Sequence, residues 1–226
     1  MEAMAAKVLG LAVWVIPVLL AITFHEAAHG YAAYVLGDDT AKRAGRLSLN
    51  PKNHIDPVGT ILMPLALYFL AGFVFGYAKP VPVRFDRLRR PRRDMILVAL
   101  AGPAANIALA IVGTLLIPVV VLLPSFLGQW FIESLHILII FNLILAVFNM
   151  LPVPPLDGGR VISGLLPPHV ARSYARVEPY GIFIIIGTIM LLPILLRPFG
   201  LDFQPADYLI WMPAEFLYSL LLSIVG

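Results

Sequence analysis

The chain has no cysteine and few charged residues. Of its 226 residues, 13% are charged and 60% are hydrophobic, and the mean hydropathy is +0.91. Soluble domains carry about 25% charged residues, so an ordinary soluble globule is excluded, and the hydrophobic content excludes a disordered chain. The lack of cysteine excludes a disulfide scaffold, an iron–sulfur site and a thiolate zinc site. The composition therefore predicts an all-α polytopic membrane protein that forms a single domain over residues 1–226.

Apolar stretches of membrane-spanning length alternate with basic segments. A helix needs about 20 apolar residues to cross the hydrocarbon, and the suitable stretches are 8–36, 58–77, 95–123, 130–151, 180–197 and 207–225. The segments 37–57, 79–94 and 157–178 hold 14 of the 16 Lys and Arg residues. Because cytoplasmic loops collect Lys and Arg, we expect the net charge of +3 to reflect topology in a cell membrane, with the lipid bilayer and no nucleic acid as a partner.

The stretch 58–77 decides how the basic segments are placed. Six full crossings would put 37–57 and 79–94 on opposite sides, whereas re-entry of 58–77 puts all three basic segments on the cytoplasmic side. Glycine and proline within 58–77 suit a broken segment. We therefore expect five to six transmembrane helices, with re-entry favoured over crossing. Residues 79–83, which read Lys-Pro-Val-Pro-Val, are expected to form a small extended strand, because proline restricts the residue before it to β-like angles.

Three ionisable residues interrupt the first apolar stretch. They form the pattern H-E-x-x-H as His25, Glu26 and His29. Residues four apart share a helix face, so both imidazoles can bind one metal ion. Glu26 can then face a water bound to that metal and take its proton. Each such group costs at least about 2 kcal/mol in a membrane helix, which favours an active site over a polar packing cluster or a proton relay.

A third ligand is needed, because catalytic zinc sites usually have three from the protein. Glu133 and His136 lie at the expected outer end of 130–151, whereas Asp157 follows its inner end, on the side of the two histidines. The prolines before Asp157 end the helix, and the glycines after it permit a tight turn, which can present the carboxylate inward. A plain Asp-Gly-Gly turn is the alternative.

These motifs together resemble the site-2 protease family of intramembrane zinc metalloproteases, in its compact prokaryotic type without a PDZ or CBS domain. The H-E-x-x-H pattern at 25–29 is followed by N-x-x-P-x-P-P-L-D-G at 149–158, and weaker similarities occur at 45–51, 54–60, 78–83 and 101–106. The resemblance extends from about residue 10 to residue 195. It implies a peptidase that cuts the transmembrane helix of a membrane-protein substrate, as in regulated intramembrane proteolysis.

The resemblance also implies residue roles. His25, His29 and Asp157 correspond to the ligands of one Zn²⁺ ion, Glu26 to the general base, and Asn149 to a residue that holds the substrate strand or assists the oxyanion. The active site is expected toward the cytoplasmic side. Because a substrate helix must unwind before cleavage, a strand edge within 58–83, including Val81 and Val83, is expected to pair with it. The rival interpretations are a membrane metal-ion transporter and an inactive family member that only binds helices.

Other polar residues receive weaker interpretations. His54 is expected to bond to the backbone of its own loop, with a role beside the metal or substrate, or as a ligand, as the alternatives. Asn106 is expected to pack between helices rather than to act in catalysis. Asn142 is expected to face the bundle or a polar partner.

Overall fold

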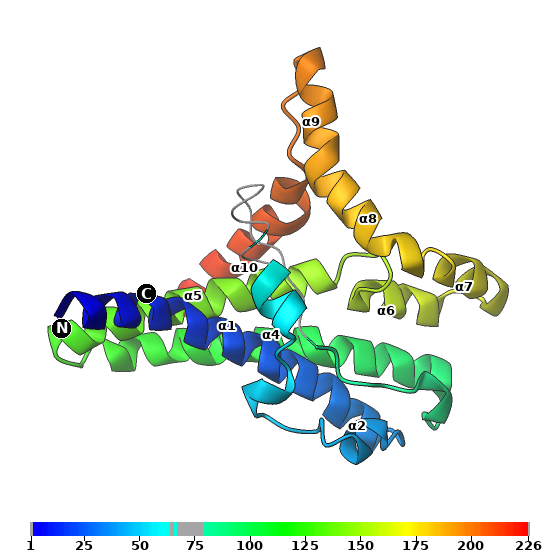
Figure 1. Ribbon diagram of the computed structural model, residues 1–226, viewed down its shortest axis with the longest axis horizontal. Coiled ribbons are helices and arrows are strands. Elements are labelled where there is room, and N and C mark those ends of the chain that lie inside the picture. Colours follow the sequence, from blue (N-terminus) through cyan, green and yellow to red (C-terminus); the bar gives the residue numbers. More distant parts are fainter. Residues whose placement is uncertain (1, 64–65, 67–78, 226) are drawn as a thin grey trace.

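The computed structural model describes residues 2–63, 66 and 79–225, and within this part it contains helices and no strand (Figure 1). The longer helices are α1 (Glu2–Val35), α4 (Pro91–Val120), α5 (Ser125–Asn149) and α10 (Met212–Leu222). The shorter helical elements are α2 (Thr40–Arg43), η1 (Pro51–Asn53), η2 (Pro57–Leu62), η3 (Phe85–Arg87), α6 (Asp157–Leu165), α7 (Pro168–Ala175), η4 (Glu178–Tyr180), α8 (Gly181–Ile186), η5 (Gly187–Leu191), α9 (Leu192–Leu196), η6 (Arg197–Phe199) and η7 (Asp207–Trp211).

The described part contains 4 helices long and apolar enough to cross a membrane, which are Val13–Val35, Pro91–Val120, Leu127–Asn149 and Pro168–Phe199. They overlap the expected stretches 8–36, 95–123, 130–151 and 180–197, although the fourth starts earlier than expected, at Pro168. The prediction of an all-α, multi-pass membrane protein is confirmed. The expected stretch 207–225 is helical in η7 and α10 but is not among the 4 spans. Most of 58–77, and with it the prediction of re-entry, lies outside the described residues.

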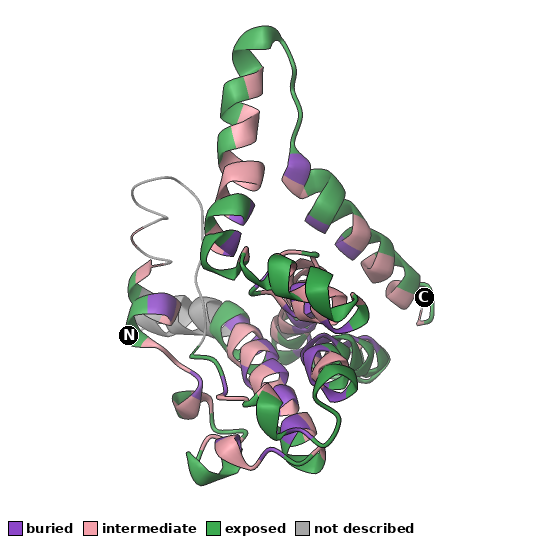
Figure 2. Ribbon diagram, turned by 90° about the vertical axis from the view of Figure 1, so that its right-hand side faces the viewer, coloured by how far each residue is buried: buried purple, intermediate pink, exposed green. Residues whose placement is uncertain are grey.

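Helices α1, α4 and α5 lie side by side and form the bundle (Figures 1 and 2). A buried cluster of Ala110, Ile139, Leu143 and Ala214 joins α4, α5 and α10. Since hydrocarbon surrounds the bundle, helix association depends on close packing rather than on the hydrophobic effect. Small residues such as Ala110 and Ala214 permit that approach.

The segment from α8 to η6 extends away from the bundle, and the chain then turns back to α10 (Figure 2). Only 11% of the apolar stretch of this fourth span is buried inside the protein, compared with 44% of the apolar stretch of α1. Phe183, Ile194 and Phe199 are exposed along it. An apolar helix with this little protein cover is suited to contact with lipid.

The strand expected at 79–83 is not formed in the described part of the chain. Residues 79–84, here called the strap, instead run along α1 without a sheet partner. The backbone N–H groups that a sheet would pair are bonded to other elements: Lys79 N to His54 O at 3.0 Å, Val81 N to Glu26 Oε2 at 2.8 Å, and Arg84 N to Asp38 Oδ2 at 2.6 Å. Pro80 and Pro82 have no N–H to offer. The proline rule restricts only local backbone angles. It gives no information on which side chains accept hydrogen bonds from these N–H groups, and here side chains of α1 and of the turn after it do so.

Asp38 fastens the strap to the C-terminal end of α1. Its side chain is fully buried and accepts hydrogen bonds from Arg84 N and from both the backbone and the hydroxyl of Thr40. Burial opposes ionisation of this carboxyl, but the bonds from Thr40 and Arg84 outweigh burial and hold the pKa of Asp38 below its ordinary value. The ionised carboxylate therefore stabilises the folded strap.

We expect Asp38→Ala to lower the free energy of unfolding by about 1–3 kcal/mol, because the Arg84 and Thr40 donors lose their partner. Thermal unfolding in detergent measures the change. The matched control is Asp39→Ala, which removes partly exposed ion pairs with Arg43 and Arg87 and should cost about 0–1 kcal/mol. In the wild type the Asp38 contribution should persist at neutral pH and disappear as the pH falls below about 3.9. Equal losses in the two variants would contradict this role.

Candidate active site

The two histidines of the H-E-x-x-H pattern lie on one face of α1 and are both buried, His25 with 6% and His29 with 7% of its surface exposed. Their four-residue spacing brings them to the same side of the helix. The two Nε2 atoms are 3.1 Å apart, and the rings meet edge to face. α1 therefore directs two nitrogen atoms at one point.

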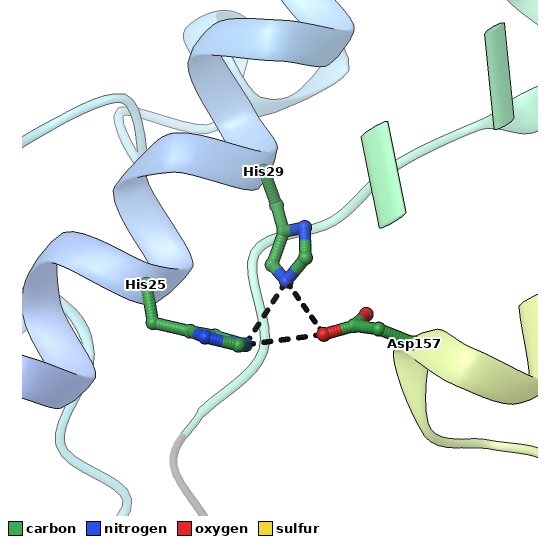
Figure 3. Close-up of side chains that lie close together, drawn as sticks. All are labelled: His25, His29 and Asp157. Carbon is green, nitrogen blue, oxygen red and sulfur yellow. Dashed lines mark hydrogen bonds and ion pairs between the residues drawn. The ribbon is translucent and has the colours of Figure 1, made fainter. Parts of the chain in front are cut away.

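Asp157, the first residue of α6, completes the group (Figure 3). Its Oδ2 lies 3.3 Å from Nε2 of His25 and 3.3 Å from Nε2 of His29. The chain reaches this point because α5 ends at Asn149 and three prolines follow before α6 starts. Gly158 is required for the close return, since a Cβ there would lie 2.2 Å from the carbonyl oxygen of Met150.

The geometry of this group suits a metal ion. His25, His29 and Asp157 each offer one ligand atom, and the described residues contain no other such group. Zinc bonds of about 2.0–2.1 Å in a tetrahedral site place ligand atoms about 3.3 Å apart, which matches the observed separations of 3.1–3.3 Å. Asp157 Oδ2 is also buried without a hydrogen-bond partner. A buried acceptor without a donor beside two imidazole nitrogens is the pattern expected where a cation binds.

Hydrogen bonds at the far side of each ring orient the imidazoles. Nδ1 of His25 lies 2.6 Å from Oδ1 of Asn106, and Nδ1 of His29 lies 2.7 Å from the carbonyl oxygen of Val98. A carbonyl oxygen only accepts, so these contacts assign the hydrogen to Nδ1 in both rings. The lone pair of each Nε2 then faces Asp157, as a metal ligand requires.

Gly102 of α4 borders the group on a third side. A Cβ at this position would lie 2.3 Å from Nε2 of His29 and 2.6 Å from Cε1 of His25. Any other residue would therefore place a carbon atom against Nε2 of His29 and the ring of His25. Sequence reasoning missed this role, although Gly102 stands in the similar stretch 101–106.

Glu26 and Asn149 are not part of the metal-binding group. Glu26 is half-buried, and its Oε2 accepts a hydrogen bond from Val81 N at 2.8 Å. Asn149 is half-buried at the end of α5, and its Nδ2 donates to Leu145 O at 3.0 Å. Within the described residues, the structure shows no contact from Asn149 to the metal-binding group.

Two other histidines make different contacts. His54 is buried, and its Nε2 donates to Ser48 O at 2.7 Å, which matches the loop-backbone interpretation. His136 bonds to the hydroxyl of Tyr218 on α10. Neither belongs to the metal-binding group found among the described residues.

The prediction for Asn106 was incomplete, because this residue contacts a candidate ligand as well as neighbouring helices. Arg160 was not singled out from the sequence. Its Nη1 lies 3.9 Å from Asp157 Oδ1, and its guanidinium lies 5.4 Å from the ring centroid of Phe85. The sequence does contain a signal for this contact, because residues three apart on a helix, such as Asp157 and Arg160, are neighbours on the helix surface.

Comparison with known proteins identifies the family. The family model described as Peptidase family M50 matches residues 119–192, a range that contains α5, α6 and Asp157. No solved structure matches the chain.

Several relatives carry the name "Putative zinc metalloprotease". YwhC of Bacillus subtilis is 41% identical over 213 residues, which cover 84% of this chain and 92% of the relative. Rip2 of Mycolicibacterium smegmatis is 29% identical over 188 residues, or 80% of this chain and 67% of the relative. MJ0611 of Methanocaldococcus jannaschii is 47% identical over 102 residues, or 44% of this chain and 50% of the relative. The chain thus belongs to Peptidase family M50, the site-2 proteases, and is a multi-pass membrane zinc metalloprotease.

Proposed function

We propose that the protein hydrolyses peptide bonds within or near transmembrane helices of membrane-protein substrates, with His25, His29 and Asp157 as the zinc ligands and Glu26 as the general base. The convergence of three buried ligand atoms at the end of a membrane span carries this proposal. In this proposal, residues 1–226 form a single intramembrane protease domain. The biological process it serves is regulated intramembrane proteolysis.

In the proposed reaction, the zinc ion and the side chain of Glu26 have different roles. A zinc ion held there supplies a Lewis acid that polarises a carbonyl group and makes water more acidic. Glu26 receives the proton of the attacking water at its carboxylate and delivers it to the amide nitrogen that leaves. The peptide and water are thereby converted into a carboxylic acid and an amine.

The strap assigns different tasks to the two oxygen atoms of Glu26. Oε2 is held by Val81 N, which leaves Oε1 to receive the proton. A fixed carboxylate needs no reorganisation when the reaction starts, which lowers the entropic cost of the proton transfer. The strap therefore serves as a positioning element for the general base.

Asn149 is proposed to bind the substrate carbonyl or main chain. One Nδ2 hydrogen is used by Leu145 O, and the second hydrogen of the amide can point to the substrate. Such a donor stabilises the oxyanion that develops during acyl transfer.

The proposed cytoplasmic orientation rests on the distribution of basic residues. The C-terminal end of α1 and the N-terminal end of α4 meet in a cluster of Ala33, Leu88 and Val98. The arginines next to this cluster are exposed, namely Arg84, Arg87, Arg89, Arg90, Arg92 and Arg93. Lys and Arg collect on the cytoplasmic side, so the end of the bundle that carries the metal-binding group faces the cytoplasm.

The strap also limits how an unwound substrate can pair with the enzyme. The N–H groups of Lys79, Val81 and Arg84 are bonded within the protein, and Arg46 donates to the carbonyl oxygen of Lys79. Main-chain pairing with a substrate strand would therefore use Val83 and the carbonyl oxygen of Val81.

Glu26→Gln should reduce cleavage of single-span model substrates in liposomes by about 10²–10⁴-fold. Zinc content, measured by mass spectrometry of the purified protein, should stay at the wild-type level because Glu26 is outside the ligand group. Asp157→Asn is the contrasting variant and should lose zinc as well. Zinc flux that persists in Glu26→Gln liposomes, with no cleavage by the wild type, would support the transporter interpretation instead.

Val81→Pro removes the N–H that holds Glu26 Oε2, so cleavage should fall by roughly 10-fold while zinc content is retained. The matched control is Val81→Ala, which keeps the N–H and removes only side-chain packing. If both variants lose the same activity, the hydrogen bond is not the cause, and unchanged cleavage in Val81→Pro would refute the positioning role.

Gly102→Ala should reduce both zinc content and cleavage strongly, because the added Cβ meets Nε2 of His29. Gly187→Ala is the control, since no heavy atom lies within 4 Å of a Cβ at that helical position. Retention of zinc in Gly102→Ala would argue against the proposed ligand set.

A further inference from the structure

Two buried asparagines join three helices to one of the candidate zinc ligands. Asn106 on α4 and Asn142 on α5 both have 0% of their surface exposed. Nδ2 of Asn106 donates to Oδ1 of Asn142 at 2.7 Å and to Ala21 O on α1 at 3.2 Å, while its Oδ1 faces Nδ1 of His25 at 2.6 Å. Nδ2 of Asn142 donates to Leu138 O at 2.7 Å. The chain of bonds therefore runs from the backbone of α5 to His25.

A backbone carbonyl fixes the direction of every bond in this chain. Leu138 O can only accept, so it holds the amino group of Asn142 and turns Oδ1 of Asn142 toward Asn106. Asn106 must then present its amino group to Asn142 and its oxygen to His25. The imidazole consequently keeps its hydrogen on Nδ1 and its lone pair on Nε2, which is the tautomer that binds a metal ion.

Simple helix packing does not account for this arrangement. Buried polar residues often join membrane helices, but Thr114 shows how a buried polar side chain in α4 is satisfied locally, by its bond to Ala110 O. In contrast, Oδ1 of Asn142 accepts a hydrogen bond from Asn106, a residue that contacts His25. Asn142 itself makes no contact with His25, His29 or Asp157 among the described interactions.

We propose that Asn142 is a positioning residue of the zinc site, which acts through Asn106 to set the tautomer and orientation of His25. This inference rests on the proposed function, because it takes His25 as a zinc ligand. Mutation of a residue that hydrogen-bonds to a zinc-binding histidine typically weakens metal affinity by about 10–100-fold. Asn106 touches the ligand directly, so its removal should have the larger effect, and removal of Asn142 the smaller one.

The first experiment measures the zinc dissociation constant of the purified full chain in detergent by competition with a chelator. Asn142→Ala and Asn142→Leu should each weaken zinc binding by roughly 10-fold, and Asn106→Ala by up to about 100-fold. The Leu variant fills the volume that Ala leaves empty, so agreement between the two separates the lost hydrogen bond from a cavity. Thr114→Val is the matched control and should bind zinc like the wild type.

A double-variant cycle distinguishes positioning from structural support. If Asn142 acts through Asn106, then Asn142→Ala should cause no further loss of zinc affinity in a chain that already carries Asn106→Ala. If the loss of zinc affinity in the double variant equals the product of the two single losses, the proposal is wrong. Wild-type zinc affinity in both Asn142 variants would also overturn it.

A spectroscopic readout without zinc completes the test. In the metal-free wild type, ¹⁵N chemical shifts should show His25 with its hydrogen on Nδ1, whereas Asn142→Ala should show a mixture of both tautomers. An unchanged tautomer in Asn142→Ala would contradict the mechanism. His25→Ala separates the two proposals: zinc affinity unchanged by His25→Ala refutes the ligand set, whereas a loss there with normal Asn142 variants refutes only the positioning role.

Discussion

The contact of Asp157 with the two imidazoles of α1 requires ionisable groups to be held where little water can solvate them. Each such group costs at least about 2 kcal/mol in a membrane helix, and an unpaired buried acceptor adds to that cost. The chain meets this constraint by satisfying the outward-facing atoms of the group. Nδ1 of each imidazole has a carbonyl oxygen as its partner. Asp157 Oδ2 has no hydrogen-bond partner, and it lies together with the two Nε2 atoms where a metal ion could bind.

The same constraint explains why the loops matter as much as the spans. The strap is held by Asp38 at one end and His54 at the other, and between these points it fixes one oxygen of Glu26. The proposed general base is thereby held in one orientation before a substrate binds. The end of the bundle that carries the exposed arginines thus also carries the candidate site and the strap.

The sequence predicted those parts of the candidate site that depend on local rules. The four-residue spacing of His25 and His29 follows from helix geometry, and the prolines before Asp157 end α5 as expected. The contact between Asn106 and His25 joins residues 81 positions apart, and no local pattern specifies which helices become neighbours. Gly102 was missed for the same reason. The strand at 79–83 was predicted from proline rules alone, which do not include competition from the carboxylates of Glu26 and Asp38.

Close backbone contacts restrict the turn that presents Asp157. A Cβ on Gly158 would collide with Met150 O, and one on Gly181, the first residue of α8, would lie 1.6 Å from Pro154 O. The turn that presents the carboxylate is therefore enclosed between the end of α5, the start of α6 and the start of α8. Tyr174 adds a hydrogen bond from its hydroxyl to Pro152 O at 2.8 Å. Because carbonyl groups on this turn face glycines, little room remains for it to shift without moving a helix. This rigidity suits the proposed role of Asp157 as a zinc ligand, since ligand atoms must stay within a few tenths of an ångström of their bonding distance.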